Sequence, residues 1–170
     1  NFDTFSYEWY DNTTPDPSNG LTPYHNMQRI VDICHKFVDN FDKEAANILF
    51  FGGTGTGKTF LSNCIARELL NTSHSVIYLT AIELFTFQRQ DFSRFGEDKD
   101  SDANYLSDCD LLIIDDLGTE VGNTYTNSKL FYVINERMLK KKSTIISTNL
   151  SLSEIRDSYS ERIFSRITSS

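Results

Sequence analysis

The segment FGGTGTGKTF at residues 51–60 constrains the fold of this chain more than any other feature. Gly52, Gly57, Lys58 and Thr59 in this segment match the pattern G-x-x-x-x-G-K-[ST]. The apolar run NILFF precedes it and predicts a strand, and KTFLSNCIARELL follows with a pattern typical of a helix. Glycines let several backbone N–H groups converge on one anion, and a helix N-terminus adds partial positive charge. The sequence therefore predicts a phosphate-binding loop between a strand and a helix.

This loop also carries two side chains with separate expected tasks. Lys58 is expected to reach the β and γ phosphates of a nucleoside triphosphate, and the Thr59 hydroxyl is expected to ligate Mg²⁺. The residues that we expect to contact the nucleotide are Gly52, Gly53, Thr54, Gly55, Thr56, Gly57, Lys58, Thr59 and Phe60.

A magnesium site of this kind needs a carboxylate at the end of a neighbouring strand, and the segment DLLIIDDLG supplies one. Four apolar residues, 111–114, predict a buried parallel strand that emerges at Asp115 and Asp116. Asp115 is expected to hold the metal through water. Asp116 is expected to orient and deprotonate the attacking water, so the pattern predicts hydrolysis of the nucleotide.

Short apolar segments alternate with helical ones along most of the chain. NILFFG, SVIYLTA, LLIID and STIISTN predict strands, and KTFLSNCIARELLN, AIELFTFQRQDF and SKLFYVINERMLKKK predict the helices between them. Such alternation predicts an α/β fold with a mainly parallel sheet covered on both faces. We expect residues 1–44 to form an N-terminal segment with an aromatic start, a proline-containing loop and one helix, packed on a core of residues 45–170. The segment GEDKDSDAN at 96–104 predicts a polar acidic loop.

Composition excludes several other classes of protein. The net charge of −8 argues against a protein that coats nucleic acid by charge alone, because that affinity comes from Lys and Arg. Cys34, Cys64 and Cys109 are widely spaced, which favours buried thiols over disulfides or a zinc site. The sequence has no apolar run long enough to span a membrane and no signal peptide at its start, so we expect no membrane association and a cytoplasmic location.

Four segments in order, GGTGTGKT, LLIIDDLGTE, STIISTN and SERIFSRI, resemble the AAA+ ATPases. Within this group the chain resembles the DnaC/DnaI-type replicative helicase loaders and the related IstB-type transposition ATPases. The resemblance implies a P-loop NTPase fold with three α/β/α layers that binds ATP or ADP with Mg²⁺. It also implies that Asn149 senses the γ phosphate, and that Arg166, or its rival Arg162, acts as an arginine finger toward the ATP of a neighbouring subunit. A solvated helix surface is the alternative for both arginines.

The resemblance extends to two further segments. NFDTF resembles the aromatic segment that opens the ATPase domain in loaders and initiators, which places the base near this region, although Phe2 and Phe5 also suit a core. Residues 80–100 resemble a helical element that touches single-stranded DNA in loaders and initiators. Within it, Arg89 and Arg94 alternate with Phe87, Phe92 and Phe95, but Leu84, Phe85, Gln88 and Phe92 equally suit a core stripe. The run Lys140–Lys142 fits a solvated helix end better than a DNA patch.

Some features depart from the family pattern. Many AAA+ ATPases have Glu where this chain has Asp116, which predicts slow hydrolysis and leaves Glu120 as an alternative base. The chain ends at RITSS, so we expect a lid or small domain to be absent or truncated. Only about 45 residues precede the first strand, which fits an isolated ATPase domain without the helicase-gripping domain of loaders.

These motifs leave four functions open. The leading hypothesis is an ATPase that self-associates through a shared ATP site and loads a replicative ring helicase onto single-stranded DNA. The second is an IstB-type ATPase that assists a transposase on duplex DNA. A small P-loop nucleotide or metabolite kinase is the third, and it lacks support because STN and the paired arginines do not fit it. The fourth is a nucleotide-gated binding module without catalysis.

Overall fold

A computed structural model of the chain describes residues 1–91, 101–119 and 124–168. Over these residues four strands form one parallel sheet in the order β1-β4-β3-β2. They are β1 (Ile48–Phe51), β2 (Val76–Thr80), β3 (Leu111–Leu117) and β4 (Ser143–Thr148). The two central strands are buried along almost their whole length, as expected for a parallel sheet with both faces covered. The prediction of a mainly parallel sheet is confirmed.

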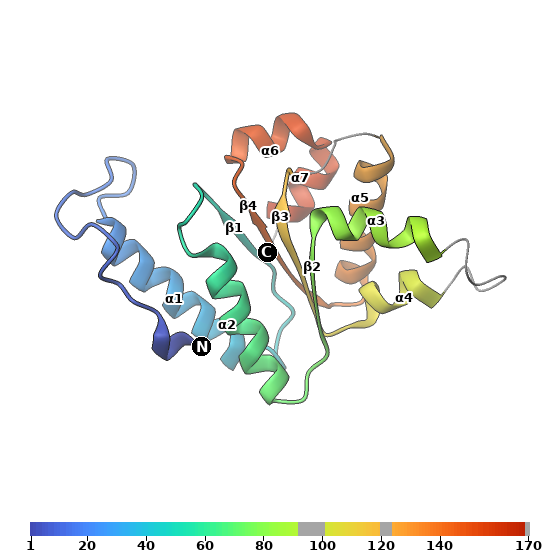
Figure 1. Cartoon of the computed structure of the whole chain (residues 1–170), viewed down its shortest axis with the longest axis horizontal. Helices are drawn as coiled ribbons and strands as arrows, with labels where there is room; N and C mark the ends of the chain where they lie inside the picture. The colour runs from blue at the N-terminus through green and yellow to red at the C-terminus, as the bar shows by residue number, and fades with distance from the viewer. Residues whose placement is uncertain (92–100, 120–123, 169–170) are drawn as a thin grey trace.

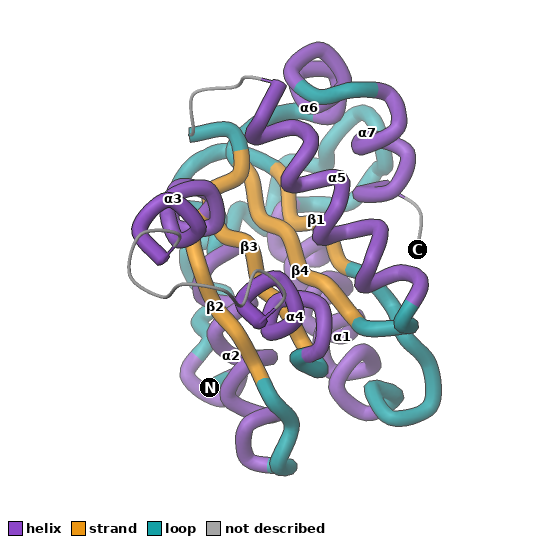
Figure 2. The backbone as a smooth tube through the Cα atoms, turned by 90° about the vertical axis from the view of Figure 1, so that its right-hand side faces the viewer, coloured by secondary structure: helices purple, strands orange, loops and turns teal. Residues whose placement is uncertain are grey.

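Helices cover the sheet on two sides and make it the middle of three layers (Figures 1 and 2). One side carries α1 (Pro23–Asp39) and α2 (Lys58–Asn71). The other side carries α3 (Ala81–Asp91), α4 (Ser101–Asp108), α5 (Thr124–Leu139), α6 (Leu152–Ser158) and α7 (Glu161–Thr168). A short 3₁₀ helix, η1 (Phe2–Thr4), begins the chain. No helix in the described ranges combines the length and the apolar character needed to cross a membrane.

Alternate residues of β3 supply the two halves of the core. Ile113 packs with α1 and α2, whereas Leu112 and Ile114 pack with the helices of the opposite side. This division follows from the two-residue period of a strand, which sends successive side chains to opposite faces. The three cysteines, Cys34, Cys64 and Cys109, are buried free thiols, as predicted.

The acidic segment at 96–104 differs from the prediction in part. Residues 96–100 lie outside the described residues, but residues 101–104 belong to α4, so the prediction of a loop there was wrong. Leu106 near the C-terminal end of this helix and Cys109 directly after it are buried in the core. The segment GEDKDSDAN is almost entirely polar, so no helical period of apolar residues could be read from it.

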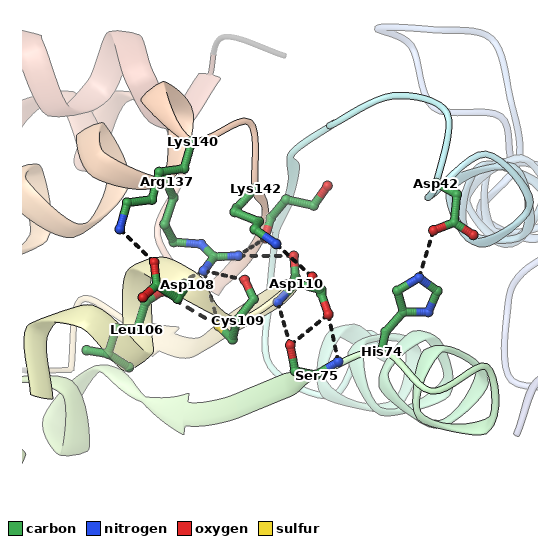
Figure 3. Close-up of polar contacts among 11 residues, drawn as sticks. Asp42, His74, Ser75, Leu106, Asp108, Cys109, Asp110, Arg137, Lys140 and Lys142 are labelled. Atoms are coloured by element: carbon green, nitrogen blue, oxygen red, sulfur yellow. Dashed lines mark hydrogen bonds and ion pairs between the residues drawn. The ribbon is translucent and has the colours of Figure 1, made fainter. Parts of the chain in front are cut away.

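Arg137 on α5 is fully buried and joins three segments at the amino end of β3 (Figure 3). Its guanidinium donates to the carbonyls of Leu106 (2.6 Å), Cys109 (2.9 Å) and Ser143 (2.5 Å). These bonds tie α5 to the turn between α4 and β3 and to the start of β4. The arginine therefore satisfies backbone groups that the turn would otherwise bury without partners.

Two lysines of the run 140–142 support the same turn. Lys140 contacts the Asp108 carboxylate at 2.6 Å, and Lys142 contacts the Asp110 carboxylate at 2.7 Å (Figure 3). The ammonium of Lys142 is the main reason why the pKa of Asp110 lies well below its usual value. Two lysines of the run thus form local ion pairs, and Lys140 and Lys141 are exposed at the end of α5, as the interpretation of a solvated helix end expects.

Replacing Arg137 with Met should lower the free energy of unfolding by about 3 kcal/mol or more, because each buried carbonyl left without a donor costs about 1–3 kcal/mol. Urea unfolding followed by circular dichroism measures the change. Arg67→Met, at an exposed position of α2, is the matched control and should change stability by less than about 0.5 kcal/mol. Equal stability of the two variants would contradict the structural role of Arg137.

Candidate nucleotide-binding site

The predicted site residues lie at the carboxyl edge of the sheet. The glycine-rich loop follows β1, Asp115 and Asp116 lie near the end of β3, and Asn149 directly follows β4. Because β4 lies between β1 and β3, Asn149 is placed between the loop and the aspartates. In open α/β sheets this edge is where ligands bind.

The loop adopts a conformation that glycines make possible. Gly52, Gly55 and Gly57 have φ values of 135°, 80° and 88°. Gly57 is the N-cap of α2, and a Cβ there would lie 3.0 Å from the Tyr10 hydroxyl oxygen and 3.6 Å from the Phe5 ring. The left-handed backbone and the close aromatic neighbours both require glycine at this position.

Lys58 connects the loop to the end of β4. Its ammonium donates to the carbonyls of Gly52 and Gly53 and to Oδ1 of Asn149, each at 2.8 Å. An ammonium has three donors, and these three acceptors engage all of them. The structure thus brings together two residues that are 91 positions apart in the sequence and were both predicted for the site.

Thr59 connects the loop to β3. Its hydroxyl lies 3.1 Å from Oδ2 of Asp115. Asp115 is 4% exposed, and burial raises the pKa of its carboxyl group. Hydrogen bonds from Ser147, Tyr78 and Thr59 lower it by more, so the pKa lies below its usual value and the group is ionised at neutral pH.

These two residues fit the magnesium ion that the sequence implies. A hydroxyl and an ionised carboxylate 3.1 Å apart present the oxygen ligands that Mg²⁺ prefers, at the start of a helix where phosphate would bind.

Ser147 of β4 and Tyr78 of β2 also belong to this site, and sequence reasoning missed both. Each donates a hydrogen bond from its hydroxyl to the Asp115 carboxylate. Ser147 is a polar residue inside the β-branched run STIISTN, which is a weak signal for a polar site. Tyr78 gives no comparable signal, because tyrosine is common in strands.

Asp116 lies in an irregularity of β3. The pairing of β3 with β4 shifts register between Ile114 and Leu117, and Asp116 has a φ of 56°. The expectation that the strand ends at the aspartates was wrong, because β3 continues to Leu117, which is 1% exposed and accepts a hydrogen bond from Thr148. Such a bulge changes the direction of the side chains near it.

The N-terminal segment packs against the back of the loop. The Tyr10 hydroxyl lies 3.3 Å from the carbonyl of Thr56, and the Phe5 ring packs against Phe60 at 5.6 Å between centroids. A pocket of about 230 Å³ opens beside it, and its lining includes residues of the loop, of α1 and of β1 with Tyr10. Phe2 is buried against His35 of α1, which confirms the core interpretation for that residue.

Arg166 contacts its own chain on α7. Its guanidinium donates to Oδ1 of Asn135 at 3.0 and 2.9 Å and lies 4.6 Å from the centre of the Phe131 ring. Arg162, one turn earlier, is exposed. The alternative of a solvated surface therefore fits Arg162 better than Arg166, which is half-buried.

Several predicted residues cannot be placed. Glu120, Phe92, Arg94 and Phe95 lie outside the described residues, and so do the side chains of Phe87, Gln88 and Arg89. Leu84 and Phe85 of α3 are buried in the core, which confirms the core interpretation for these two residues.

The family model of the IstB-like ATP-binding proteins matches residues 27–166. The chain belongs to this family. Among curated members, the chain is 30% identical over 132 residues to the replicative helicase loader DnaC of Escherichia coli (strain K12), covering 78% of this chain and 54% of the relative. The chain thus spans about half the length of this relative of the IstB-like family.

Solved structures agree on the fold of this IstB-like chain. A DnaC helicase loader matches with a TM-score of 0.74 at 24% identity, covering 98% of this chain and 90% of that one. The replication initiator DnaA bound to AMPPCP and single-stranded DNA matches with a TM-score of 0.69 at 23% identity, covering 82% and 43%. The fold is that of the P-loop AAA+ ATPases, as predicted.

Gly57→Ala should lower the free energy of unfolding by about 1–2 kcal/mol, because an L-residue with this positive φ is strained. Chemical denaturation measures the loss. Gly53→Ala is the control, since a Cβ there meets open space, and it should change stability by less than about 1 kcal/mol. A larger loss in Gly53→Ala than in Gly57→Ala would show that the loop conformation is wrongly described.

Proposed function

We propose that this chain is the ATP-hydrolysing domain of a protein that loads a replicative ring helicase onto single-stranded DNA. The observation that carries the proposal is the convergence of Lys58, Thr59, Asp115 and Asn149 at one edge of the sheet. Each has a chemical type suited to a magnesium triphosphate, and together they come from three separate parts of the chain: the start of α2, β3 and the end of β4. Membership of an ATP-binding family supports the same ligand.

Each of these residues has a separate role in the proposed hydrolysis. When bound, MgATP supplies the electrophilic phosphorus and the metal that offsets phosphate charge. Lys58 binds the phosphates, and Thr59 and Asp115 hold the metal, Asp115 through water. Asn149, within reach of Lys58, positions the γ phosphate and the attacking water.

Asp116 orients the attacking water and accepts its proton at a carboxylate oxygen. Its left-handed backbone inside the irregularity of β3 distinguishes its placement from that of the buried Asp115. An aspartate is one methylene shorter than a glutamate, so we expect slow hydrolysis.

Arg166 completes the site of a second copy of the chain. Asn135 and Phe131 hold its guanidinium on the surface of α5, and this positions the charge before a neighbour arrives. Arg162 is the alternative finger on the same helix. A guanidinium in this role contributes about 10³–10⁵ in rate, so a lone subunit should be nearly inactive.

The partners are proposed from the relatives. A curated relative is named as a replicative helicase loader, which supports a ring helicase as partner. A structural neighbour is a DnaA bound to single-stranded DNA, which supports that strand as a ligand. An IstB-type transposition helper is the alternative, and it keeps the same ATP site because both functions share every motif.

Steady-state ATP hydrolysis measured against protein concentration, with and without single-stranded DNA, tests the proposal. We expect the rate per subunit to rise with concentration and to respond to DNA, because the site is shared between subunits. A rate per subunit that depends on neither protein concentration nor DNA would contradict the assembly and favour a self-contained kinase-like site.

Lys58→Ala should weaken ATP binding by about 10-fold or more, since it removes charge-assisted hydrogen bonds of about 1.5–3 kcal/mol each. Lys141→Ala, at an exposed position, is the control.

Mixing variants tests the role of Arg166 in trans. Arg166→Ala should retain ATP binding and lose the concentration-dependent hydrolysis. Mixed with Lys58→Ala, which keeps its arginine, it should regain part of that rate, because one intact site then forms between the two variants. If the mixture stays inactive while Arg162→Ala shows complementation with Lys58→Ala, the finger is Arg162.

A further inference from the structure

Tyr78 lies on an edge strand, but its side chain contacts a residue of the candidate site. It lies in the middle of β2, paired with Ile113 of β3, and Thr80 is the residue that pairs with Asp115. Side chains two residues apart on a strand share a face, so Tyr78 and Asp115 both lie on the face covered by α2. The phenol therefore extends along the sheet and donates its hydroxyl to Oδ2 of Asp115.

The partners of Asp115 divide between its two oxygens. Oδ1 accepts from the Ser147 hydroxyl and, at 3.1 Å, from the backbone N–H of Asp116. Oδ2 accepts from Tyr78 and, at 3.1 Å, from Thr59. The carboxylate is thus held on one side by β4 and on the other side by β2, the strands on either side of β3.

The two donors to Oδ2 differ in their expected relation to the metal. Thr59 is the residue expected to ligate Mg²⁺, so its hydroxyl oxygen serves the metal as well as the carboxylate. Tyr78 is not expected to ligate the metal: its ring is rigid, its side chain has few rotatable bonds, and its strand is paired with β3 over five residues. It can therefore hold the plane of the carboxylate whether or not Thr59 changes its contacts.

We propose that Tyr78 is a positioning residue of this site, which fixes the Asp115 carboxylate for Mg²⁺ by donating from its hydroxyl to Oδ2. The inference rests on the proposed function, since it assumes that Asp115 holds the metal. Tyr78 acts through Asp115 and needs no contact with nucleotide. Its effect should therefore be confined to the part of nucleotide affinity that depends on the metal.

The test is Tyr78→Phe, which removes one oxygen and keeps the ring. Binding of a fluorescent ATP analogue is titrated in Mg²⁺ and again in EDTA, and Mn²⁺ affinity in the presence of ADP is measured by electron paramagnetic resonance. We expect the affinity gain from Mg²⁺ and the Mn²⁺ affinity to fall by about 3- to 10-fold, which corresponds to the net contribution of one typical hydrogen bond. Affinity in EDTA should change less than about 2-fold. Tyr105→Phe, 66% exposed on α4, is the matched control and should change nothing.

Three other outcomes would contradict either the inference or the proposed function. If Tyr78→Phe keeps the wild-type response to Mg²⁺, the positioning role is wrong. If its affinity falls equally in Mg²⁺ and EDTA, or its thermal unfolding temperature drops sharply, Tyr78 supports the fold only and the inference is also overturned. If the wild-type chain binds the triphosphate with no dependence on metal, the proposed function fails at its magnesium site, whatever Tyr78 does.

Discussion

Burial of the Asp115 carboxylate requires hydrogen-bond donors from every element around it, and this requirement determines how the site is built. A buried charge without partners is very costly, because water no longer solvates it. Ser147 of β4, Tyr78 of β2 and Thr59 of α2 meet the requirement together. The same contacts place the first turn of α2, and with it the glycine-rich loop, over the end of the central strand.

The amino end of β3 is held by a second polar cluster. Arg137 supplies donors to the turn before the strand, and Asp110 binds Lys142 on one side and Ser75 on the other (Figure 3). The apolar stretch between the two clusters is fully buried. With both ends held by specific hydrogen bonds and the middle held by packing, the strand has one register, and the aspartates are fixed relative to the loop.

Two further contacts lie on opposite sides of the sheet, one at the glycine-rich loop and one on α7. Tyr10 joins the N-terminal segment to the glycine-rich loop by a hydrogen bond to the carbonyl of Thr56. Arg166 lies on the opposite layer, held by Asn135 of α5. In the proposed assembly Arg166 reaches the nucleotide of the next subunit.

The sequence by itself determined the parallel α/β architecture, the loop around Lys58 and the acidic end of β3, because these depend on local period, glycine content and short motifs. The order of the strands and the bulge at Asp116 came only from the tertiary structure, since they depend on which segments pair. The roles of Tyr78 and Ser147 also came only from the tertiary structure. Their residue types are ordinary in strands, and only their contacts with Asp115 identify them as residues of the site. The contact between Lys58 and Asn149 joins positions 91 residues apart, and only the placement of β4 beside β1 brings them within 2.8 Å.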